Sequence, residues 1–215
     1  MSKVILSEQS SVPSTPASGK VAIYVDNTAT PRLILQDDLG DLIPQATLIN
    51  SSVTSVSAGY AADTYLAGSS IIIPAGKWRA KQQYRCKFDM TKTAAGIATP
   101  IITLRMGTLG TTGDAAIQTI TFGAGTALAD TGVFEVLVTF RTIGSGTSAV
   151  TQAVAKVDHH LGLTGLTSTG AVGTGIILGT SAGFNSTTQT TIGLSFNGGA
   201  SFSGTCTLVQ AELLG

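Results

Sequence analysis

Hydrophobic and charged residues alternate one by one in the run Tyr84-Arg-Cys-Lys-Phe-Asp-Met90. Because successive side chains of a β-strand point to opposite faces, this run predicts a strand with one buried face and one solvated face. A helix would repeat its buried positions about every three or four residues, and no long run of this chain does so. Further runs rich in β-branched and aromatic residues span 71–73, 78–80, 101–106, 117–122, 133–141, 150–158, 190–196 and 205–213.

Glycine-rich segments separate these runs and predict turns, at 107–114, 123–125, 144–146 and 198–199. About eight or nine short strands without intervening helices exclude a parallel α/β sheet and favour an antiparallel architecture. No fixed-period repeat and no heptad pattern is present, which excludes a solenoid and a coiled-coil shaft. We therefore expect an all-β fold over residues 51–215, either a two-sheet β-sandwich or a jelly roll.

The chain up to residue 50 differs from the rest in composition. Residues 7–19 (SEQSSVPSTPASG) are polar and contain prolines that disfavour helix, so an extended N-terminal arm is expected. Residues 21–25 and 32–36 are β-type runs on either side of a turn-rich segment, which predicts a small β-hairpin. Because an isolated hairpin is marginally stable in water, this one is expected to need a partner surface.

Charged residues are scarce and balanced. Asp, Glu, Lys and Arg make up 11% of the chain, against roughly 25% of an average soluble domain, and 12 basic residues balance 12 acidic ones. With no net charge, neither nucleic acid nor a membrane surface is expected as a partner. Residues 142–215 contain only Lys156, Asp158 and Glu212 as charged residues. A β-surface with so few charges tends to associate with other chains, so we expect an oligomer in which this surface is covered.

Groups that could support catalysis are few. Because His159 and His160 would point to opposite faces of a strand, the pair and the adjacent Asp158 favour a strand end over a metal site or a catalytic triad. No HExxH or Walker sequence is present, so no enzymatic activity is expected. A glycoside-cleaving pair of carboxylates stays open, because its two members can be distant in the chain. The glutamates are Glu8, Glu135 and Glu212.

No metal or cofactor is expected either. Three aspartates between residues 37 and 41 could bind a cation, but their spacing does not match an EF-hand loop, and a solvated turn is favoured. The glycines of 107–113 lack the lysine and the following helix of a phosphate-binding loop, which favours a β-turn. Cys86 and Cys206 have no CxxC spacing and are interpreted as reduced core residues.

Basic residues cluster in one stretch, interleaved with aromatic ones. The stretch contains Lys77, Trp78, Arg79, Lys81, Tyr84, Arg85 and Lys87. Lys77, Arg79 and Lys81 alternate, so on a strand they would line one face. Arg85 and Lys87 would continue that stripe on the next strand. Such a face could bind an anionic glycan or an acidic neighbour, whereas the zero net charge disfavours nucleic acid. A solvated strand surface is the plainer alternative.

Two parts of the chain resemble virion structural proteins of tailed bacteriophages. Pro13-Ser-Thr-Pro-Ala-Ser-Gly19-Lys-Val-Ala-Ile-Tyr24, followed by Leu33-Ile-Leu-Gln-Asp37-Asp-Leu-Gly40, is similar to the opening of many fibre and head-fibre proteins. The second part comprises residues 73–78, 88–100, 132–141 and 144–150. The family arm often carries doubled prolines, whereas Pro13 and Pro16 stand singly here.

The resemblance implies a homotrimer, a jelly-roll-type module and an arm that attaches to another virion protein, such as the major capsid protein or a tail protein. The attachment residues that it implies are Pro13, Pro16, Tyr24, Leu33 and Leu35. The protein would be assembled in the host cytoplasm and act in the virion. No catalytic residue comes with the resemblance.

We therefore expect a non-enzymatic surface protein of the virion, a capsid decoration or head fibre, with residues 1–50 as anchor and 51–215 as module. The alternative is a tail-fibre or baseplate receptor-binding module that recognises a host surface glycan. Its candidate sugar-stacking aromatics are Trp78, Tyr60, Tyr65 and Tyr84. A glycan depolymerase is a third hypothesis, which would need an acid and base pair.

Overall fold

The computed structural model divides the chain into two compact units, residues 1–47 and residues 48–215. It describes residues 8–9, 15, 17–20, 22–26, 32–36, 42–43, 48–54, 56–93, 95–168 and 174–214. Among these residues, no helix has the length and apolar character needed to cross a membrane. The sequence placed the boundary near residue 50, whereas strand β5 (Leu48–Ser52) already pairs with a strand of the larger unit.

The smaller unit contains one sheet with the strand order β1-β2-β3-β4. The strands are β1 (Glu8–Gln9), β2 (Ala22–Asp26), β3 (Arg32–Gln36) and β4 (Leu42–Ile43). β2 and β3 pair antiparallel, so the predicted hairpin is confirmed. Tyr24 is buried in β2, and Leu33 and Leu35 lie in β3. Pro13 and Pro16 of the predicted arm, and the aspartates between residues 37 and 41, lie outside the described residues.

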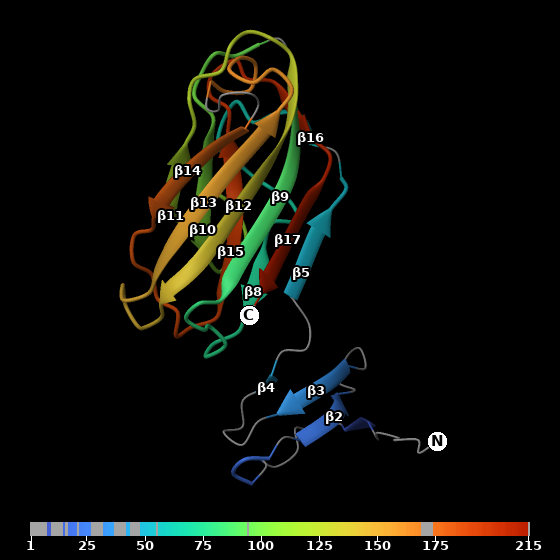
Figure 1. Cartoon of the computed structure of the whole chain (residues 1–215), viewed down its shortest axis with the longest axis vertical. Helices are drawn as coiled ribbons and strands as arrows, with labels where there is room; N and C mark the ends of the chain where they lie inside the picture. The colour runs from blue at the N-terminus through green and yellow to red at the C-terminus, as the bar shows by residue number, and fades with distance from the viewer. Residues whose placement is uncertain are drawn as a thin grey trace. The chain divides into compact units, whose positions relative to one another are not determined.

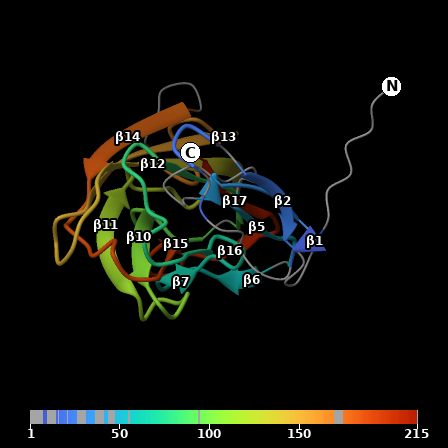
Figure 2. The same ribbon diagram turned by 90° about the horizontal axis from the view of Figure 1, so that it is seen from below.

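The larger unit is a sandwich of two antiparallel sheets, drawn side-on in Figure 1 and end-on in Figure 2. The larger sheet has the order β14-β13-β12-β9-β16-β6, and β17 pairs with both β9 and β5. The smaller sheet has the order β11-β10-β15-β7, and β8 also pairs with β15. The predicted all-β sandwich is therefore confirmed.

The bounds of these strands show how the chain moves between the sheets. Those of the larger sheet are β6 (Val56–Gly59), β9 (Gln83–Lys92), β12 (Asp130–Thr142), β13 (Val150–His159), β14 (Thr174–Thr180), β16 (Gly204–Cys206) and β17 (Val209–Leu214). Those of the smaller sheet are β7 (Thr64–Tyr65), β8 (Ile71–Ile73), β10 (Ile101–Gly107), β11 (Ala115–Thr121) and β15 (Thr190–Asn197). A meander, β12-β13-β14, forms one side of the larger sheet, and the chain then crosses to β15 in the other layer.

Two predicted strands differ from the structure. Residues 78–80 lie in the connection between β8 and β9 and are not a strand, because the backbone turns there with positive φ at Gly76 and Lys81. Residues 205–213 form two strands, β16 and β17, with a break at Thr207 and Leu208. Six strands, β1, β4, β5, β6, β7 and β14, were not predicted, because their sequences are short or rich in serine and glycine.

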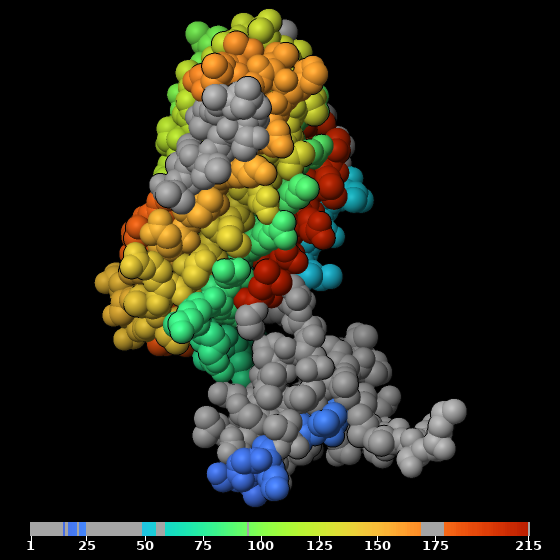
Figure 3. All heavy atoms as spheres, in the orientation of Figure 1, coloured from blue at the N-terminus to red at the C-terminus, as the bar shows by residue number. Residues whose placement is uncertain are grey.

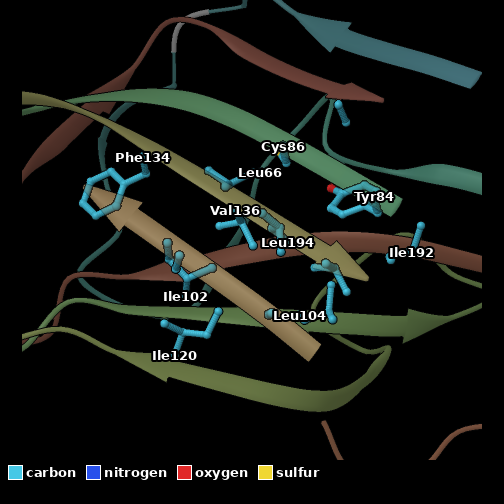
Figure 4. Close-up of a cluster of buried hydrophobic side chains, with 14 of the residues drawn as sticks. Leu66, Tyr84, Cys86, Ile102, Leu104, Ile120, Phe134, Val136, Ile192 and Leu194 are labelled. Carbon is cyan, nitrogen blue, oxygen red and sulfur yellow. The ribbon is translucent and has the colours of Figure 1, made fainter. Parts of the chain in front are cut away.

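The hydrophobic core lies between the two sheets and is aromatic at its centre. Phe134 stacks on Phe88 with ring centroids 5.1 Å apart, and Phe196 of the smaller sheet meets Phe134 at 5.5 Å. In Figure 4, Ile102 and Leu194 lie with Phe134 and other apolar side chains between the two layers of strands. The inward residues of the alternating runs thus form the core, as the period of two predicts.

Both cysteines are free and buried, so the interpretation of Cys86 and Cys206 as reduced core residues is confirmed. Burial disfavours the thiolate and raises the pKa of each thiol to about 12. Neither thiol is therefore a ready nucleophile near neutral pH.

Asp89 explains why the last predicted strand breaks in two. Its carboxylate accepts hydrogen bonds from the backbone N–H of Thr207 and of Leu208, both at 2.7 Å, and from the Thr207 hydroxyl at 2.6 Å. These N–H groups face a side chain instead of a neighbouring strand, so β16 ends at Cys206 and β17 begins at Val209. Partial burial opposes ionisation of Asp89, but the hydrogen bonds outweigh it and lower the pKa of the carboxyl group.

We predict that Asp89→Asn destabilises the protein by about 1 kcal/mol at pH 7, a value kept small because Asp89 is largely solvated. A carboxyl pKa that is lower in the folded state adds stability above the unfolded pKa of about 3.9, and this stability disappears as the pH falls through the folded value. Urea unfolding of both proteins at pH 7 and near pH 2 measures the difference. An equal difference at the two pH values would show that ionised Asp89 is not the stabilising group.

Candidate functional site

The predicted basic stripe is divided by the structure. Lys77, Arg79 and Lys81 lie in the connection between β8 and β9, so they do not line one face of a strand as predicted. The Arg79 guanidinium donates hydrogen bonds to the carbonyl oxygens of Gly76 and Trp78 within the same connection. Arg85 and Lys87 lie on β9 and are exposed on its outer face.

Trp78 does not belong to this surface, which corrects its prediction as a contact residue. Its side chain is 2% exposed and packs against Phe140 and Phe184, with ring centroids 4.6 Å and 5.5 Å away. Tyr60 and Tyr84 are also buried. None of these three rings could stack on a sugar in the folded protein.

An ion-pair network fixes Arg85 on the outer face of the larger sheet. The guanidinium lies 2.6 Å from the Glu135 carboxylate on β12 and 3.3 Å from that of Glu212 on β17. These neighbours raise the pKa of Arg85, mainly through the hydrogen bond to Glu135. Arg85 therefore pairs with both Glu135 and Glu212. Its guanidinium is already occupied and is not a free group for binding a ligand.

The remaining acidic residues of the larger unit are also engaged by protein groups, apart from Asp158. Asp63 binds Arg105, Asp89 binds Thr207 and Leu208, Asp114 binds the backbone N–H groups of Leu109 and Gly110, and Asp130 binds His159. Several cations have no such partner among the described residues: Lys77, Lys81, Lys87, Arg141 and Lys156. The charged side chains of this unit that lack an ion-pair partner among the described residues are therefore mostly basic.

Lys87 and Lys156 flank a shallow hollow on the outer face of the larger sheet. The hollow measures about 200 Å³ and is lined by Lys87, Val133, Glu135, Lys156 and Asp158. Cross-strand register explains the grouping, because Glu135 on β12 lies opposite Lys87 on β9 and opposite Lys156 on β13. Figure 3 views this face, where β13, β12, β9 and β17 run side by side.

The second polar cluster is buried under the loops at one end of the sandwich. His159 Nδ1 lies 2.6 Å from Asp130 Oδ2, and both side chains are fully buried. The Asp130 carboxylate also accepts hydrogen bonds from the backbone N–H of Thr131, Leu161 and Leu166. Asp130 therefore ties the end of β13 and the following loop, residues 160–168, to the start of β12.

Lys92 completes this buried cluster from β9. Its ammonium donates hydrogen bonds to the carbonyl oxygens of Thr126, Leu128 and Gly165, and burial lowers its pKa while the Asp130 charge opposes that change. Gly165 has φ +82°, and a Cβ atom there would lie 2.3 Å from Asp130 Oδ2. The close approach of this loop to Asp130 therefore requires glycine at position 165.

The geometry of Asp130 and His159 resembles part of a catalytic triad but does not expose a reactive group. Both side chains are shielded from solvent, and His159 Nε2 has no hydrogen-bond partner among the described residues. His160 is exposed, so the two histidines point to opposite faces as predicted. Within the described ranges, no group of His, Cys, Asp or Glu side chains could hold a metal ion. We interpret the cluster as structural, because Asp130 holds the loop of residues 160–168 against the start of β12.

The two ends of the sandwich differ in their connections. β5 begins at Leu48, which pairs with Leu213, at the end where β9 also begins. The loops held by Asp130 and Lys92 lie at the opposite end, where β9 finishes at Lys92. Exposed apolar side chains at that opposite end are Ile97, Leu128, Leu161 and Leu163. The first strand of the larger unit thus begins at the end of the sandwich away from these loops.

Comparison with known proteins gives no family assignment. No family model matches the chain, and no curated protein is similar to it in sequence. Support for a function therefore comes from the resemblance to phage structural proteins and from the surface chemistry of the larger unit.

Sequence reasoning missed several residues of these two clusters. Lys156 and Asp158 were noted as charges, but only the pairing of β13 with β12 brings them beside Lys87. Asp130 and Lys92 were not identified, although a lone Asp that opens a long strand is a weak signal for a buried partner. Their roles depend on contacts between residues about 30 or more positions apart, and no local motif marks them.

Proposed function

We propose that this protein is a non-enzymatic structural protein on the surface of a tailed-phage virion, a capsid decoration or head fibre. Residues 1–47 would anchor it and the sandwich would project from the particle. The observation that carries the proposal is the division into a small β-unit and a larger sandwich, whose first strand begins at the end opposite its loops.

The surface chemistry of the sandwich is consistent with such a role. The buried clusters are hydrogen-bonded to backbone groups, as expected for a rigid scaffold, and the long neutral segment after residue 142 favours association of copies into the trimer that the resemblance implies. A virion module acts by burying surface against neighbours, with about 1,600 Å² for a stable interface.

Deletion of residues 1–47 tests the anchor. We expect the truncated protein to fold and to keep the oligomeric mass of the full chain, but to be absent from phage particles, because its attachment unit is gone. The measurement is the amount of each form in gradient-purified particles, with oligomeric mass from light scattering as the control.

Two outcomes would contradict this proposal separately. Normal incorporation of the truncated protein would show that residues 1–47 are not the anchor. Absence of the full-length protein from the same purified particles would show that it is not a virion component.

A second candidate function is a tail-fibre or baseplate module that binds a host surface glycan. The observation that favours it is the excess of unpaired cations on the larger unit, including Lys87 and Lys156 on the outer face of the larger sheet. These cations could attract acidic sugars, although the rings first considered for stacking, Trp78 and Tyr84, are buried.

A further inference from the structure

The hollow on the outer face of the larger sheet combines two free ammonium groups with an acceptor. Lys87 and Lys156 lie on strands either side of β12, so their Cα atoms are roughly 10 Å apart. Neither lysine makes an ion pair with a described residue, although Glu135 lies between them. The Glu135 carboxylate is instead bound by Arg85 at 2.6 Å, which leaves both lysines available to an external anion.

Asp158 gives the hollow a second kind of group. It lies two residues after Lys156 on β13, opposite Val133, and makes no ion pair with a described residue. An ionised carboxylate only accepts hydrogen bonds, so Asp158 selects a donor such as a hydroxyl group. The Val133 side chain supplies an apolar floor between these polar walls.

From this arrangement we infer that the hollow is a binding site for a carboxylated sugar residue of an acidic polysaccharide. Lys87 and Lys156 bind the sugar carboxylate, and Asp158 accepts hydrogen bonds from ring hydroxyl groups. The hollow is smaller than the roughly 300–1,000 Å³ of a drug-sized ligand site, so it suits one ring of a longer chain.

The mixed charges favour a polyuronate over nucleic acid. A nucleic acid presents closely spaced phosphates and few hydroxyl donors, so Asp158 and Glu135 would repel it. A uronic acid carries one carboxylate and several hydroxyl groups on each ring, which matches two ammonium groups beside one free acceptor. The biological setting of this inference rests on the second candidate function. The binding itself is a property of the isolated protein and is tested on it.

Binding of alginate oligosaccharides to the full-length protein tests this site, with dextran as the neutral sugar and single-stranded DNA as the phosphate polyanion. We expect alginate to bind, more weakly at high salt, and the double variant Lys87→Gln/Lys156→Gln to weaken binding at least tenfold. The matched control Lys77→Gln/Lys81→Gln removes the same charge outside the hollow, and its effect should stay below threefold.

Asp158→Ala separates sugar recognition from simple charge attraction. Loss of a negative charge would tighten binding of any polyanion by attraction alone, whereas loss of a hydroxyl acceptor weakens binding of a uronic acid. We expect weaker alginate binding. Tighter binding by this variant, an equal loss in the control double variant, DNA binding as strong as alginate binding, or no alginate binding would each overturn the inference.

These outcomes are independent of particle assembly. A protein that incorporates into virions but does not bind alginate retains the structural role and loses the sugar site. A protein that binds alginate through Lys87 and Lys156 but is absent from particles retains the sugar site and loses the virion assignment.

Discussion

Asp130→Ala is expected to lower the free energy of unfolding by about 3–5 kcal/mol, because it removes one partner of a fully buried ionisable pair. The variant leaves His159 without its 2.6 Å contact and leaves the backbone N–H groups of Leu161 and Leu166 without an acceptor. Unpaired buried donors carry a desolvation cost that packing cannot recover. Urea unfolding, followed by the fluorescence of Trp78 at the other end of β9, measures the loss.

Asp158→Ala is the matched control for Asp130→Ala. It removes a carboxylate from the same region of the larger sheet, but from an exposed position without an ion pair among the described residues. Its effect on stability should stay within about 0.5 kcal/mol. Hydrogen exchange at Leu161 and Leu166 should also rise sharply in Asp130→Ala. If the two variants unfold at the same urea concentration, Asp130 does not stabilise the loop of residues 160–168.

The long alternating strands were predictable because the two-residue period of a strand acts locally. In β9, the hydrophobic residues that the sequence assigns to the inner face are the buried ones, and the burial of β12 and β13 follows the same period of two. The same reasoning failed where Lys77, Arg79 and Lys81 alternate with the apolar residues Trp78 and Ala80. There, the positive φ of Lys81 and the burial of Trp78 depend on packing against Phe140, which local sequence does not specify.

The candidate sites were less predictable because register between distant strands builds them. Arg85 and Lys87 were correctly assigned to an outer strand face, but the partners of that face lie on β12, β13 and β17. A shift of one residue in the pairing of β12 with β13 would move Lys156 to the opposite face. Composition indicates that charges are few, whereas only the pairing shows that Arg85 engages two glutamates and leaves the lysines free.

Phe134→Ala is expected to destabilise the protein by about 3–5 kcal/mol, because it opens a cavity where the two sheets meet. The ring is fully buried, stacks on Phe88 of its own sheet and contacts Phe196 of the other sheet at 5.5 Å. With a urea dependence of about 2 kcal/mol per molar, the unfolding midpoint should fall by about 1.5–2.5 M.

Val133→Ala is the control for Phe134→Ala. Val133 is the preceding residue of β12, but its side chain points to the outer face, so truncating it leaves no enclosed cavity. Phe134→Leu should recover part of the stability, because it refills most of the volume. A loss below about 1 kcal/mol in Phe134→Ala would mean that neighbouring rings collapse into the space. The sheets would then be joined by the surrounding aliphatic contacts of Ile102 and Leu194, and the aromatic cluster would not be the centre of the sandwich.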